Sequence, residues 1–158
     1  MLNEDGMVHD DGVTTRLGEN HYIMTTTTGG AANVLSKLED YLQTEWPELD
    51  VYLTSVTDHF ATISVCGPNS KKIVSTVIDD LDFSDENFPH MTFKNAKISK
   101  INCRVMRISF TGELSYEINV QANYAKSVWE KCMEAGKDFN ITPYGTETMH
   151  LLRAEKGF

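Results

Sequence analysis

The sequence lacks the features that mark membrane-spanning, secreted and nucleic-acid-binding proteins. No apolar run approaches the ~20 residues that span a bilayer, and the N-terminus has no basic and apolar leader. Basic residues are few: 14 Lys and Arg stand against 23 Asp and Glu, which gives a net charge of -9. Such a surface repels phosphate backbones and anionic headgroups. We therefore expect no nucleic acid and no membrane among the partners.

Cysteine is also scarce. The three cysteines, Cys66, Cys103 and Cys132, are widely spaced and form no C-x-x-C pair. A disulfide framework is therefore disfavoured, and the reducing cytoplasm is the expected compartment. Each cysteine has apolar neighbours in the sequence, which favours a small buried side chain over a reactive thiol.

The familiar catalytic and cofactor motifs are absent as well. The sequence has no glycine-rich dinucleotide fingerprint, no P-loop, no H-E-x-x-H and no G-x-S-x-G. The five histidines show no metal-ligand spacing, and the acidic stretch 79–89 lacks the D-x-D-x-D-G pattern of a calcium loop. We expect no metal site, and no flavin or NAD site in this segment.

What is present is an ordinary globular composition, with 41% hydrophobic and 23% charged residues in 158. The patterns predict about seven strands and about four helices. The helices fall at residues 31–43, 70–80, 123–135 and 143–156, and the clearest strands at 13–17, 21–27, 51–57, 60–66, 103–110 and 114–121. Most strands are joined by turns, which predicts the α+β class, with a largely antiparallel sheet and helices on one face. Both ends of the chain look abrupt, so we expect a fragment of a longer polypeptide.

Two acidic features are candidate functional residues. The first is the Asp10-Asp11 pair, and the second is Glu117. In the strand predicted over 114–121, Tyr116 and Ile118 share the inward face, so alternation places Glu117 on the opposite, polar face. Taken alone, each carboxylate could equally be a solvated surface group.

Four stretches, in order along the chain, carry a resemblance to a known family. They are LNEDGMVHDD at 2–11, CGP at 66–68, RISFTGELSYE at 107–117 and LRAEKGF at 152–158. They resemble the N-E-x-G-G-x-x-D-D, G-P, T-G-E-x-x-x-E and L-R-x-E-x-G motifs of the glycine cleavage T-protein (aminomethyltransferase) family. Within it, YIMTTTT, TEWPELDV and TSVTD are most similar to the folate-binding region of the sarcosine oxidase alpha subunit and dimethylglycine dehydrogenase branch.

The resemblance implies a function in one-carbon metabolism. Residues 1–158 would be part of an aminomethyltransferase-type folate-binding domain, without the family's N-terminal strands and C-terminal barrel. It would bind tetrahydrofolate and pass to it a one-carbon unit from an oxidised N-methyl amine, which gives 5,10-methylenetetrahydrofolate. The fragment alone is expected to be inactive. Other subunits of an oxidase complex would be partners, and FAD or FMN and NAD would lie in other segments or subunits.

The resemblance also implies roles for four residues. Asp11 matches the catalytic aspartate, and alternation would then turn Asp10 away from the cleft. Glu117 matches the glutamate that holds the pteridine, whose two parallel N–H donors one carboxylate can bind as a fork. Ile23 and Thr25 fall on positions that line the folate pocket. No metal is implied.

Three alternatives stay open. The chain could belong to the aminomethyltransferase of the glycine cleavage system, which runs the same folate chemistry. It could be a folate-binding module without catalysis, which would bind tetrahydrofolate and transfer nothing. It could also be a structural interaction domain in an oxidoreductase assembly, and a protein interface would then cover Asp11 and Glu117.

Overall fold

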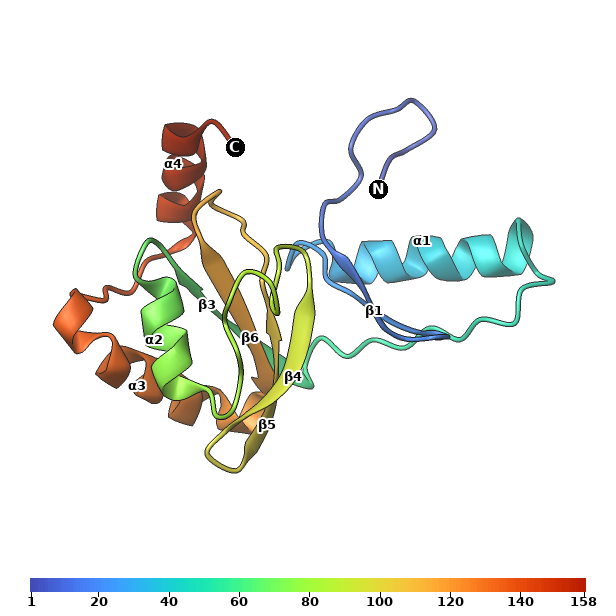
Figure 1. Cartoon of the computed structure of the whole chain (residues 1–158). Coiled ribbons are helices and arrows are strands. Elements are labelled where there is room, and N and C mark those ends of the chain that lie inside the picture. The colour runs from blue at the N-terminus through green and yellow to red at the C-terminus, as the bar shows by residue number, and fades with distance from the viewer. The chain divides into compact units, whose positions relative to one another are not determined.

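The computed structural model describes all of residues 1–158, which form two compact units, Met1–Thr57 and Asp58–Phe158. The first unit contains strands β1 and β2 and helix α1 (Figure 1). The second contains strands β3 to β6, helices α2 to α4 and two short 3-10 turns, Ala122–Tyr124 and Lys137–Phe139. None of the helices is long and apolar enough to cross a membrane.

The first unit is a hairpin followed by a helix. Strand β1 (Thr14–Gly18) pairs antiparallel with β2 (His21–Met24), and α1 (Ala31–Thr44) follows after a glycine-containing turn. The strand predicted over 21–27 ends early, at Met24. The Thr25 N–H still bonds the carbonyl oxygen of Val13, just before β1, but the Thr27 N–H donates to the Asp10 carboxylate at 2.9 Å instead of to a strand partner.

The second unit is built on a four-stranded antiparallel sheet in the order β3-β6-β5-β4. Its strands are β3 (Phe60–Cys66), β4 (Phe93–Ile98), β5 (Ile101–Met106) and β6 (Ser115–Gln121). Strands β3 and β6 pair along their whole length, so each residue of β6 has a fixed neighbour on β3. Because β6 lies between β3 and β5, its side chains have neighbours on both of these strands.

The core of the second unit lies between this sheet and two helices, α2 (Ser70–Val77) and α3 (Ala125–Ala135). Figure 1 shows both helices beside the sheet, with α4 (Thr146–Lys156) at the end of the chain. Tyr116, Ile118 and Val105 are fully buried in this core. The α+β class with an antiparallel sheet is therefore confirmed, and so is the inward face of β6.

Several predicted boundaries were wrong, each for a local reason. Residues 51–57 form no strand: Tyr52 is 90% exposed and nothing pairs with the segment. Strand β4 was missed because its sequence, FKNAKI, is polar. Helix α2 ends at Val77 because the Asp79 N–H then bonds the carbonyl oxygen of Lys97 at 2.8 Å. The link from β5 to β6 spans 107–114, so it is longer than the gap between the strands predicted at 103–110 and 114–121.

Candidate functional site

Glu117 lies in the middle of β6, on the sheet face that the helices do not cover. It pairs with Ser64 of β3 and Met106 of β5. Its strand neighbours Tyr116 and Ile118 are both 0% exposed in the core, so alternation turns Glu117 to the other face. This face is more enclosed than the sequence predicts, since Ser115 and Asn119 on the same side of β6 are buried.

Polar side chains of β3 and β6 near Glu117 on this face are bonded to one another. The hydroxyls of Ser64 and Ser115 lie 3.3 Å apart, and the Asn119 amide donates to Thr62 at 3.0 Å. The carboxylate of Glu117, although half-buried, has no hydrogen bond and no ion pair with any protein group. Burial raises the pKa of its carboxyl, because the ionised form loses water without gaining a partner. Glu117 is therefore a carboxylate with free acceptor positions.

Tyr144 lies beside this face, and sequence reasoning missed it. It sits between the turn at Lys137–Phe139 and α4, and its hydroxyl accepts a hydrogen bond from the Cys66 thiol at 3.1 Å. Burial, together with the nearby charge of Glu117, raises the pKa of Tyr144 to about 12. The phenol therefore stays neutral at physiological pH. The only available signal was an aromatic residue in a short segment between two helices.

The Asp10-Asp11 pair splits into two different environments. Asp10 is 9% exposed, and its carboxylate accepts the Thr27 N–H at 2.9 Å and the Thr27 hydroxyl at 2.8 Å. These bonds lower the pKa of Asp10, with the backbone bond as the main cause. Asp11 is exposed, and its carboxylate accepts only the neighbouring Gly12 N–H, at 2.8 Å. The Asp10 carboxylate is thus occupied by hydrogen bonds within the fold, whereas the exposed Asp11 carboxylate can still accept a bond from a ligand.

Two glycines hold this part of the chain in place. A Cβ on Gly30 would lie 1.7 Å from an Asp10 carboxylate oxygen, and one on Gly12 would lie 1.8 Å from the carbonyl oxygen of Thr25. Both positions therefore require glycine because other groups approach the backbone too closely for a side chain. The backbone on either side of Asp11 is fixed by these contacts.

Ile23 and Thr25 lie close to the same segment. Ile23 is half-buried in β2, opposite Thr15. Thr25 lies just after β2, and its hydroxyl both accepts from the Val13 N–H and donates to the Val13 carbonyl, each at 3.2 Å. Its hydroxyl is therefore already in use, which leaves the methyl group and the backbone for any contact with a ligand.

The four predicted site residues are divided between the two units. Asp11, Ile23 and Thr25 belong to the first unit, where the Gly12–Thr25 contact brings the backbone after Asp11 next to Thr25. Glu117 belongs to the second unit and lies near Tyr144, whose hydroxyl is bonded by Cys66. No group of three or more His, Cys, Asp or Glu side chains is arranged to hold a metal ion.

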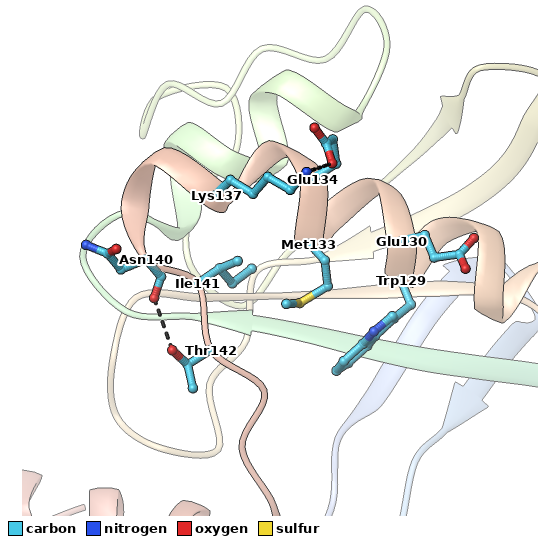
Figure 2. Close-up of a pocket in the computed structure, with 8 residues that line it drawn as sticks. All are labelled: Trp129, Glu130, Met133, Glu134, Lys137, Asn140, Ile141 and Thr142. Atoms are coloured by element: carbon cyan, nitrogen blue, oxygen red, sulfur yellow. Dashed lines mark hydrogen bonds and ion pairs between the residues drawn. The ribbon is translucent and has the colours of Figure 1, made fainter.

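A separate hollow lies on the outer side of α3. Figure 2 shows its lining, which includes Trp129, Met133 and Ile141. Its volume is about 580 Å³, and Trp129 is 42% exposed there. Its lining comes from α3 and from the segment that follows this helix, and it includes none of the residues of the Glu117 face. It is not part of the Glu117 site.

Comparison with known proteins decides the family. The model of the GCVT N-terminal domain matches residues 1–158, which is the whole chain. The chain belongs to the GCVT N-terminal domain family. The family resemblance read from the four sequence motifs is therefore confirmed.

Members of several enzyme groups are similar to this GCVT domain. It is 56% identical to the sarcosine oxidase subunit alpha of Corynebacterium sp. (strain P-1), over 100% of this chain and 16% of that protein. It is 28% identical to human mitochondrial dimethylglycine dehydrogenase, over 100% of this chain and 18% of that protein. It is 31% identical to the aminomethyltransferase of Halothermothrix orenii, over 100% of this chain and 42% of that protein.

A solved structure supports the fold. A chain of the heterotetrameric sarcosine oxidase from Corynebacterium sp. U-96, in complex with pyrrole 2-carboxylate, matches with a TM-score of 0.65 and 15% identity. The match covers 85% of this chain and 64% of that one. The mixed fold of helices and antiparallel sheet is thus shared with a known oxidase.

Proposed function

We propose that this GCVT domain is the tetrahydrofolate-binding part of a protein like the sarcosine oxidase alpha subunit. In this proposal it serves the transfer of a one-carbon unit from an oxidised N-methyl amine to tetrahydrofolate, with 5,10-methylenetetrahydrofolate as product. Similarity to sarcosine oxidase alpha subunits and to aminomethyltransferases supports a role in folate-related one-carbon transfer. Because the chain spans only 16% of those alpha subunits, the activity of the whole protein belongs to the proposal.

The observation that carries the proposal is the unpaired carboxylate of Glu117. A half-buried carboxylate without a protein partner keeps both of its oxygens free to accept hydrogen bonds from a ligand. The 2-amino-4-oxo pteridine ring carries two parallel donors, the N3–H and the 2-amino group. The two oxygens of one carboxylate accept both, and the charge strengthens each bond. Glu117 therefore fits the pteridine edge of tetrahydrofolate.

Asp11 is the proposed catalytic group. Its partner Asp10 is held by Thr27, so Asp11 is the member of the pair that is free to react. Tetrahydrofolate, when bound, supplies the two nitrogens that take up the one-carbon unit, the ring nitrogen N5 and the exocyclic nitrogen N10. An exposed carboxylate on a fixed backbone can accept a proton from such a nitrogen and can stabilise nearby positive charge. This kind of help is typically worth ~10²–10⁴-fold in rate.

Ile23 and Thr25 are proposed to line the folate pocket. Ile23 offers an apolar side chain, and Thr25 offers its methyl group, because Val13 occupies its hydroxyl. Other subunits are proposed as partners, since the similar proteins are named as subunits of an oxidase. FAD or FMN and NAD are proposed to lie outside this domain.

Calorimetric titration of the full-length protein with tetrahydrofolate tests the proposal. We expect Glu117→Ala to weaken binding by roughly tenfold to several hundredfold, because two ligand donors lose their acceptor. Glu130→Gln removes an exposed carboxylate from α3 and is the matched control, which should bind as the wild type does. Unchanged affinity of Glu117→Ala, or no binding by the wild type, would refute the proposal.

A second candidate is the aminomethyltransferase of the glycine cleavage system. The 31% identity to such an enzyme across the chain favours it. The higher identity to sarcosine oxidase alpha subunits makes it the weaker candidate. Purified full-length protein separates the two: formation of methylenetetrahydrofolate from sarcosine supports the first, and formation from an aminomethylated carrier protein supports the second.

A further inference from the structure

Arg104 presents two buried donors that the protein does not use. Its Nε and Nη1 atoms are shielded from solvent and have no hydrogen-bond partner, and no carboxylate pairs with the side chain. Buried polar groups in native proteins are nearly always bonded, and a buried charge without a partner is especially costly. A partner from outside the chain would account for these two unused donors of the guanidinium group.

The position of Arg104 connects it to Glu117. Arg104 lies in β5 directly opposite Asn119 of β6, and Met106 lies opposite Glu117. Residues paired in this way share a sheet face, so Arg104 and Glu117 are diagonal neighbours on the same side. Diagonal neighbours have Cβ atoms about 7–8 Å apart, within reach of long side chains. One ligand can therefore touch both groups.

The surroundings of Arg104 do not satisfy it. Its guanidinium carbon lies 5.9 Å from the centre of the Phe60 ring, which gives a weak cation–π contact but no hydrogen bond. The nearby Asn119 amide is engaged with Thr62. Burial lowers the pKa of Arg104, because the charged guanidinium group loses water and gains no opposite charge in return. Arg104 and Glu117 thus carry opposite charges on the same sheet face, and neither side chain has a charged partner in the protein.

We propose that Arg104 is the second polar anchor of the ligand that Glu117 binds, and that it donates to the 4-oxo oxygen of the pteridine ring. This inference rests on the proposed function. On a 2-amino-4-oxo ring the donors N2–H and N3–H are followed at once by the acceptor O4. When one carboxylate binds these two donors, the O4 oxygen beside them still lacks a hydrogen-bond donor. A guanidinium group can supply that donor.

Reach favours the ring over the tail of the ligand. The glutamate carboxylates of tetrahydrofolate lie at the far end of the molecule, beyond the aminobenzoyl group. Arg104 and Glu117 are cross-strand neighbours, so groups that bind them at once must be close together. The adjacent N3–H and O4 atoms meet this condition.

The test compares a ligand that has only the ring with one that has ring and tail. Full-length protein is titrated with 6-methyltetrahydropterin and with tetrahydrofolate, by calorimetry, for the wild type, Arg104→Met and Arg104→Lys. We expect Arg104→Met to weaken both ligands by the same factor, about tenfold to a hundredfold, and Arg104→Lys to recover part of the loss. Lys97→Met is the matched control on the same sheet face of the edge strand and should bind normally.

Each other outcome overturns the inference in a distinguishable way. A loss confined to tetrahydrofolate would place Arg104 at the tail. Normal binding by Arg104→Met, alongside weak binding by Glu117→Gln, would leave the proposed function standing and remove Arg104 from it. Failure of both Arg104 variants to fold would make the residue structural. Absence of binding by the wild type to either ligand would end the proposed function together with this inference.

Discussion

Glu117→Gln tests the polar sheet face most directly, because it removes the charge while keeping the shape of the side chain. A carboxylate offers two acceptor oxygens to the pteridine, whereas an amide offers one acceptor and one donor group. One ligand N–H would then face an N–H of the protein. The lost bond is charge-assisted and is worth about 1.5–3 kcal/mol. Tetrahydrofolate binding should therefore weaken by about tenfold to 150-fold.

The same variant should change the pH dependence of binding. Burial raises the pKa of the Glu117 carboxyl above the ordinary value of 4.5. The fork needs the ionised form, so wild-type affinity should fall as the pH is lowered through this raised pKa. In Glu117→Gln nothing titrates at the site, and the weaker affinity should not fall further for that reason.

The stability of the ligand-free protein should depend on pH in the opposite direction to the binding affinity. A carboxyl whose pKa is raised in the folded state binds protons more tightly when folded, so stability falls as the pH rises from the unfolded to the folded pKa. Above the folded pKa the penalty is fully present. Glu117→Gln should therefore raise the free energy of unfolding at neutral pH, and the gain should vanish below pH 4.5.

Calorimetric titration with tetrahydrofolate over a pH series checks the binding half of this prediction. Titration of the ligand itself affects both proteins equally, so the ratio of their dissociation constants isolates residue 117. The ratio should shrink as the pH falls. A ratio that stays constant would mean that the ionisation of Glu117 does not control binding, and the assignment of the fork would be wrong.

Three further predictions concern the first unit. Asp11→Asn in the full-length protein should abolish most methylenetetrahydrofolate formation and largely spare amine oxidation, and equal loss of both activities would mark the residue as structural. Asp10→Ala should lower the melting temperature, because two Thr27 donors lose their acceptor, and the loss relative to the wild type should disappear in acid as Asp10 protonates. Gly30→Ala should destabilise the protein by about 1–3 kcal/mol in denaturant titrations, because its Cβ would meet the Asp10 carboxylate, and normal stability would contradict the close approach of Gly30 to Asp10.

Strand β6 shows how far the sequence leads. The alternation of apolar and polar residues over 115–121 predicts both the strand and the direction of Glu117, because a one-residue shift would expose Tyr116 and Ile118. Strand β3 is predicted to the residue for the same reason. Where one face of an element is buried, the pattern determines its orientation.

The errors occur where burial does not constrain the pattern. Residues 51–57 are β-branched enough to suggest a strand, yet they find no partner, and propensity alone does not form a sheet. Arg104 was overlooked because its importance depends on what faces it across β6, and cross-strand register is not visible in one sequence. Tyr144 was missed because its contact with Cys66 joins residues far apart in the chain.

The polar sequence of β4 has a consequence for the protein in concentrated solution. Strand β4 forms one edge of the sheet. On its open side the Asp79 N–H alone bonds to it, at the carbonyl oxygen of Lys97. An open edge can accept a strand from a second molecule and so begin aggregation. Lys94, Asn95 and Lys97 are all exposed, and an added strand would have to cover two ammonium groups. The polar residues that made β4 hard to predict from the sequence therefore also oppose the pairing of this edge with the sheet of a second molecule.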